Sequence, residues 1–132
     1  MADALIPASA TQLVMPYLTA QLAQRAHTVP FSHGVPDPLP PRFATVALIN
    51  SSSDHDFSDN ALVEIAYFDP DEERAEQVSI LIKGLLQAMP ASEPGVQWTE
   101  HVSGPTRQDD PDVPDIGRYL ITTWVTVPCS IG

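Results

Sequence analysis

The sequence has little of what marks a disulfide scaffold or an anion-binding surface. It contains one cysteine, Cys129, so no internal disulfide can form and a reducing compartment is expected. Only six residues are lysine or arginine against 17 aspartate and glutamate residues, giving a net charge of −11. Because nucleic acid and anionic lipid both attract basic surfaces, this balance argues against binding either of them through charge.

Long apolar runs are also missing. No stretch approaches the roughly 20 apolar residues that a membrane-spanning helix needs. The first residues lack the basic start and the long apolar stretch of a signal peptide. The hydrophobic fraction of 43% in 132 residues is typical of a globular chain, and we expect one domain covering residues 1–132.

Motifs of catalysis are missing as well. There is no nucleophile elbow, no phosphate-binding glycine loop and no paired-histidine zinc motif. A carboxylate pair could be drawn from Asp109, Asp110, Asp112 and Asp115. However, a proline-rich loop without apolar neighbours offers no burial that would raise the pKa of a carboxyl group.

The densest polar cluster is the run from Ser51 to Asp59. Asp54, His55 and Asp56 could be imagined as a metal site, or His55 as a base beside a serine. Adjacent residues of one loop rarely converge on a point, and zinc sites normally bring spaced ligands together. We therefore interpret this run as a solvated hairpin loop, and we predict no catalytic residues, no cofactor and no metal.

The most regular pattern is a strand, a sharp acidic turn and a helix. Residues 61–68 alternate and are rich in β-branched and aromatic side chains, which predicts a strand. Asp69 is expected to cap the following helix, with Pro70 in its first position and Glu72 completing a capping box. Apolar residues at steps of three and four predict a helix over 71–89, which Pro90 ends.

The rest of the chain supplies a second helix, an arm and three more strands. Ser9 begins a helix that runs towards Arg25, where Pro16 either kinks the helix or starts its regular part. Residues 28–41 form a proline-rich arm or linker, expected to be extended. Strands are predicted over 42–49, 96–102 and 118–127. The order predicts an α+β two-layer sandwich: a four-stranded, mostly antiparallel sheet with two helices on one face.

Several dispersed segments carry a resemblance to a known family. In chain order they are Pro41-Arg-Phe-Ala-Thr-Val, Leu62-Val-Glu-Ile-Ala-Tyr-Phe-Asp, Ala75-Glu-Gln, Ser103-Gly-Pro, Asp110-Pro-Asp and Arg118-Tyr-Leu-Ile-Thr-Thr-Trp-Val-Thr-Val. Across roughly residues 29–128 the sequence resembles tail terminator (tail completion) proteins of long-tailed bacteriophages, especially those that infect actinobacteria. Ala47-Leu-Ile-Asn-Ser-Ser-Ser departs from the family pattern, which bears on the details of residues 50–60.

The resemblance implies a structural virion protein at the tail–neck junction, without catalytic residues. Such a protein assembles as a homomeric ring, usually a hexamer, which caps the tail tube, ends its polymerisation and joins it to the head-side connector or stopper. DNA then passes through the channel without specific binding, and acidic loops around the channel would repel its phosphates. The candidate lumen or interface residues are Asp54, Asp56, Asp59, Asp109, Asp110, Asp112 and Asp115. The candidate subunit-contact arm includes Pro30, Phe31, Pro36, Pro38, Pro40 and Pro41.

Three other interpretations stay open on the sequence alone. The first is a head–tail connector or stopper protein of the neck. The second is a soluble adaptor unrelated to phages, which would use the proline-rich arm to bind a partner. The third is a small hydrolase centred on His55. For the arm itself, folding back over its own sheet and reaching a neighbouring subunit are both open.

Overall fold

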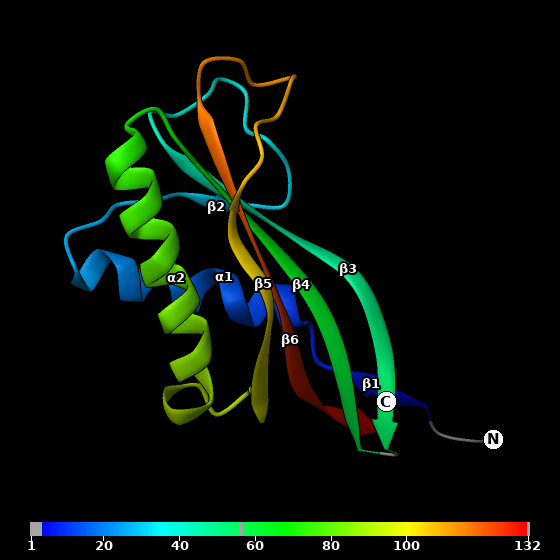
Figure 1. Ribbon diagram of the computed structural model, residues 1–132. Helices are drawn as coiled ribbons and strands as arrows, with labels where there is room; N and C mark the ends of the chain where they lie inside the picture. The colour runs from blue at the N-terminus through cyan, green and yellow to red at the C-terminus, as the bar shows by residue number, and fades with distance from the viewer. Residues whose placement is uncertain (1–3, 56, 132) are drawn as a thin grey trace.

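The computed structural model shows an α+β fold, as predicted, and describes residues 4–55 and 57–131. Figure 1 shows two helices on one side of a long, strongly bent sheet. The elements in chain order are β1 (Leu5–Pro7), α1 (Ala10–Gln24), β2 (Phe31–Ser32), β3 (Phe43–His55), β4 (Ser58–Asp69), α2 (Glu72–Ser92), β5 (Trp98–Arg107) and β6 (Gly117–Ile131). None of the helices in the described part of the chain is long and apolar enough to cross a membrane.

The sheet is larger than the four-stranded one expected from the sequence. Its order is β1-β6-β4-β3-β2, and β5 also pairs with β6. The four long strands pair antiparallel, but β2 runs parallel to β3, so the sheet is mixed. The two extra strands, β1 and β2, have three and two residues. Segments this short show no measurable alternation in a sequence, which is why they were not predicted.

The interpretation of the run from Ser51 to Asp59 as a solvated hairpin loop was wrong. β3 continues to His55 and β4 starts at Ser58, so this stretch is the end of a long hairpin. Ser51, Ser52 and Ser53 pair with Ala61, Asn60 and Asp59. Apart from Ala61, the paired residues here carry polar side chains, so the hydrophobic pattern that locates strands in a sequence is missing.

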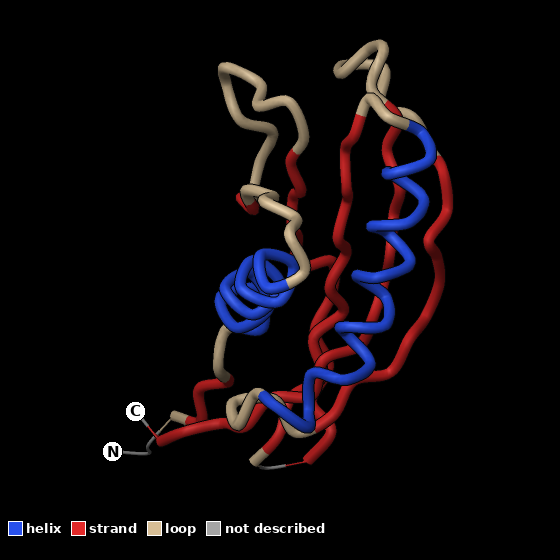
Figure 2. The backbone as a smooth tube through the Cα atoms, turned by 90° about the vertical axis from the view of Figure 1, so that its left-hand side faces the viewer, coloured by secondary structure: helices blue, strands red, loops and turns tan. Residues whose placement is uncertain are grey.

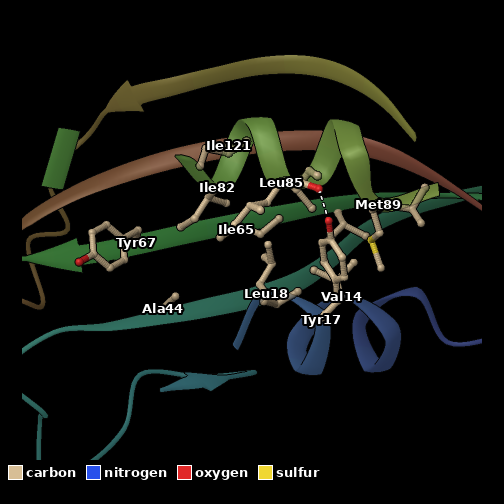
Figure 3. Packing of buried hydrophobic residues seen from close by; sticks show 14 of the residues in the cluster. Val14, Tyr17, Leu18, Ala44, Ile65, Tyr67, Ile82, Leu85, Met89 and Ile121 are labelled. Carbon is tan, nitrogen blue, oxygen red and sulfur yellow. Dashed lines mark hydrogen bonds between the residues drawn. The ribbon is translucent and has the colours of Figure 1, made fainter. Parts of the chain in front are cut away.

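The main core lies between both helices and the inner faces of β3, β4 and β6. In Figure 2, α2 runs along the strands of the sheet. The other helix, α1, is seen almost along its own axis and therefore runs across the direction of α2. Val14 and Leu18 of α1 and Ile82 of α2 are fully buried in one cluster with Ile65 of β4. The Tyr17 hydroxyl donates to the Leu85 carbonyl at 2.7 Å, and this buried hydrogen bond joins the two helices (Figure 3).

The starts of the two helices confirm one predicted cap and correct the other. The Ser9 side chain accepts from the Gln12 N–H as predicted, and α1 continues through Pro16. The cap of α2 is Asp71, not Asp69, because Asp71 accepts from the Arg74 N–H at 3.0 Å.

Pro90 does not end α2, which continues to Ser92. A proline at this position cannot bond to the carbonyl of Leu86, four residues earlier. That carbonyl instead accepts from the Thr99 hydroxyl of β5 at 2.8 Å. The lost helical bond is thus replaced by a tertiary one, which a reading of the sequence alone does not reveal.

A second, smaller core covers the outer face of the sheet at one end. The rings of Phe43 and Phe68 stack with centroids 4.4 Å apart. Val113, from the loop between β5 and β6, is buried against them, and Ile116 packs at the edge of this cluster. The expectation that this loop has no apolar neighbours was therefore wrong.

Candidate functional site

The structure does not bring the two predicted groups of acidic residues together. Asp59 lies near the hairpin end of β4 and pairs with Val127, whereas Asp69 at the other end of β4 pairs with Gly117, next to the second acidic loop. Asp69 lies ten positions after Asp59 along β4, which corresponds to about 33 Å measured along the strand at the usual rise per residue. The two acidic groups therefore occupy opposite ends of the sheet.

At the hairpin end, the carboxylates lie on strands. Asp54 belongs to β3, and the half-buried Asp59 lies opposite Ser53. Asp56 lies outside the described residues. His55 pairs through its main chain with Ser58.

At the other end, arginines pair with the loop between β5 and β6. Arg107 donates to Asp109 at 3.3 Å and also contacts Glu72 at the start of α2. Arg118 lies 3.7 Å from Asp110. The Arg107 guanidinium lowers the pKa of Asp109. The ion pairs of this loop suit an anchored acidic surface better than proton transfer.

Around this loop the structure forms an open cleft of about 490 Å³. Its lining includes Glu72 of α2, Arg107 of β5 and the loop residues Asp109, Val113 and Asp115. Asp112 and Asp115 are exposed, and the Asp112 N–H donates to the Asp110 carboxylate at 2.9 Å. Within residues 4–55 and 57–131, no three His, Cys, Asp or Glu side chains are arranged to hold a metal ion.

Sequence reasoning missed the most strongly bonded polar residue, Asp69. Its fully buried carboxylate accepts two bonds from Arg74, at 2.7 and 2.8 Å, and one from the Tyr67 hydroxyl at 2.6 Å. Arg42 lies 3.9 Å from the same carboxylate and also donates to Tyr67. The cluster joins the end of β4, the first turn of α2 and the start of β3.

Burial and hydrogen bonding act in opposite directions on the pKa of Asp69. Burial alone would raise this pKa, but the bonds from Arg74 and Tyr67 and from the Asp71 N–H lower it below its ordinary value. Burial and the neighbouring Asp69 raise the pKa of Tyr67. The only signal in the sequence was an acid directly after a strand with an arginine in the next helical turn, which also fits a cap. This cluster holds the fold together and presents no free nucleophile or base.

The proline-rich arm starts on its own sheet and then lies on the surface. Phe31 belongs to β2, and the Pro30 carbonyl accepts from the Ala44 N–H of β3 at 2.9 Å. Further along, Val35 and Leu39 are 46% and 47% exposed. The remaining predicted arm residues are exposed or half-buried: Pro36, Pro38, Pro40 and Pro41. The arm thus has an anchored start and an open middle.

One end of the sheet, formed by β1, the β3–β4 hairpin and the end of β6, extends beyond the helices (Figure 1). Six large hydrophobic residues there are 45–65% exposed: Leu5, Ile6, Leu48, Ile49, Phe57 and Ile131. Scattered exposed apolar residues are ordinary, but a group of them marks an interaction surface. No protein-family model matches this chain, and a comparison with curated proteins gives no match.

Proposed function

We propose that this protein is a structural component of a bacteriophage tail. It forms a homomeric ring, a hexamer, that caps the tail tube, ends its polymerisation and joins it to the head-side connector. The observation that carries the proposal is the exposed apolar end of the sheet, which includes Leu5, Leu48 and Ile131. In a chain with a net charge of −11, such a group of apolar residues favours contacts with protein.

The resemblance to tail terminator proteins supports the same proposal. The segments that carry it lie in β3, β4, α2, β5 and β6 and in the loop before β6. The resemblance therefore involves the body of the fold and does not depend on one loop. In this proposal the four long strands and the two helices form the two-layer subunit of the ring.

The acidic residues receive a role in the same proposal. Carboxylates around the channel repel the phosphate backbone, so DNA passes without binding. Because the two acidic groups lie at opposite ends of β4, they line the channel together only if the strands run along its axis. A ring structure that places both the Asp59 and the Asp109 groups on the outer wall would contradict this role.

The test is a tail-assembly experiment in the parent phage with this gene removed. A terminator predicts tail tubes of uncontrolled length that fail to join heads, and a plasmid copy of the gene should restore normal tails. Tails of normal length that fail to join heads would instead indicate a connector or stopper protein. Normal, infectious particles would exclude both and favour the adaptor interpretation.

A further inference from the structure

β3 leaves one edge of the sheet open over most of its length. Its partner on that side, β2, pairs only with Ala44 and Thr45. Residues 46–53, Val-Ala-Leu-Ile-Asn-Ser-Ser-Ser, contain no charged residue and no proline. Natural sheets protect exposed edges with charges, prolines or distortions. Here one bulge at Ile49 is the sole irregularity between residues 46 and 53, and Leu48 and Ile49 are more than half exposed.

The opposite edge of the sheet is formed by β5, whose one partner strand among residues 4–55 and 57–131 is β6. The second half of β5 is distorted by two register shifts around Val102 and around Gly104 and Pro105. The first half, from Trp98 to His101, pairs regularly with β6. Trp98 is 63% exposed at this regular part. β5 thus protects one half of its edge and leaves the other half open.

The two open edges lie at the same level of the sheet. Ser52 pairs with Asn60, Asn60 with Thr126, and Thr126 with Trp98, which makes one row across four strands. A second row, two positions along, runs from Asn50 through Leu62 and Trp124 to Glu100. Each row therefore starts at the open part of β3 and ends at the open part of β5, at the other edge of the sheet.

We propose that the open edge of β3, residues 46–53, pairs with the open edge of β5, Trp98 to His101, of a second copy of this chain. This interface rests on the proposed ring and assigns its two contact surfaces. A contact between two different edges leaves one edge of each kind free on every assembly. The contact therefore repeats from copy to copy, and it gives a ring when the rotation between neighbouring copies closes. The β3 edge suits a second copy of this acidic chain because it adds no like charge to the contact.

Disulfide cross-linking tests the pairing directly. In a Cys129→Ser background, which removes the chain's one cysteine, Ser51, Ser52 or Ser53 is replaced by Cys in one preparation and Glu100 by Cys in another. Mixing the two preparations at high protein concentration under oxidising conditions should give covalent dimers for at least one serine position. A chain carrying both cysteines should give a ladder of oligomers. The single variants alone should stay monomeric on a denaturing gel.

Two outcomes would overturn the proposal. Cross-linking of a serine-position variant with itself would show that β3 pairs with β3 in a two-fold dimer. Absence of any cross-link in all the mixtures would show that these edges do not meet.

A charge placed on the open edge of β3 tests the same interface independently. Ser51→Lys should lower cross-linking of the mixed preparations at least tenfold and leave the melting temperature unchanged, because Ser51 is exposed. Ile80→Lys, on the exposed surface of α2, is the matched control and should cross-link normally. Unchanged cross-linking of the Ser51 variant would contradict the interface.

This experiment can fail separately from the proposed function. Normal tails after removal of the gene, with cross-linking intact, would overturn the tail function and keep the interface. Uncontrolled tails after removal of the gene, without cross-linking, would overturn the interface alone.

Discussion

Replacing Asp69 by asparagine should reveal how far the fold depends on one buried carboxylate. The substitution keeps the shape of the side chain and removes its charge. The wild-type carboxylate receives two hydrogen bonds from Arg74 and one from Tyr67, and all of its surface is buried. Removing one partner of a buried ion pair typically costs about 3–5 kcal/mol, because the remaining charge loses its compensation.

The loss in the free energy of unfolding depends on how far the hydrogen-bond and ion-pair partners of Asp69 are exposed to water. The Arg74 side chain is 41% exposed, so water can solvate its guanidinium once the carboxylate is gone. The Arg42 side chain is only 15% exposed and Tyr67 is fully buried, so neither gains comparable solvation. We therefore expect a loss of about 3 kcal/mol for Asp69→Asn, and less than about 1 kcal/mol for Asp112→Asn in the exposed loop.

Urea unfolding at several pH values is the assay. The folded state lowers the pKa of Asp69 below its unfolded value of about 3.9. The carboxylate therefore contributes its full stabilisation above about pH 5, and this is lost as pH falls through the folded pKa. The difference between wild type and variant should be constant from about pH 5 to 8 and should shrink below about pH 4. A difference under 1 kcal/mol at pH 7, or one that does not depend on pH, would refute the reasoning.

Four further predictions concern the core, the tyrosines and metal. Leu85→Ala should cost about 2–5 kcal/mol in urea unfolding, whereas Ile80→Ala on the exposed side of α2 should change stability by less than about 0.5 kcal/mol. Tyr17→Phe should cost about 0.5–1.5 kcal/mol, because it removes the buried hydrogen bond that joins α1 to the Leu85 carbonyl of α2. Because the pKa of Tyr67 is raised, the wild type should lose stability above about pH 10, and Tyr67→Phe should lose less, in melting curves across that range. A chelator should leave the melting temperature unchanged, and a clear decrease would contradict the prediction that no metal is required.

The sequence by itself determined the class of the fold and the position of its long elements. The apolar repeat of α2 and the alternation in β4 and β6 predicted the helix and the strands that supply most of the core. These signals are local, because each depends on the spacing of residues within one element. The Ser9 cap was predicted for the same reason, since it is set by two residues three positions apart.

Tertiary structure decided which residues act as caps and where the elements end. Asp69 is as good a cap in sequence as Asp71, but the buried hydroxyl of Tyr67 and the guanidinium of Arg74 bind its carboxylate. The bond from Thr99 to the Leu86 carbonyl likewise lets α2 pass through Pro90. In both cases a side chain outside the helix-end pattern forms the decisive hydrogen bond. The sequence rules for helix ends do not include such side chains.

The same holds for the candidate site. The sequence gathers its acidic residues into two groups, but only the register of β4 with β6 shows that these groups lie at opposite ends of the sheet. The open edges of β3 and β5 are also invisible in sequence, because whether a strand has a neighbour depends on the order of strands in the sheet. The spacing of residues along the chain fixes the local structure. Strand order and register decide which residues far apart in sequence lie side by side, and the candidate contact surfaces depend on that arrangement.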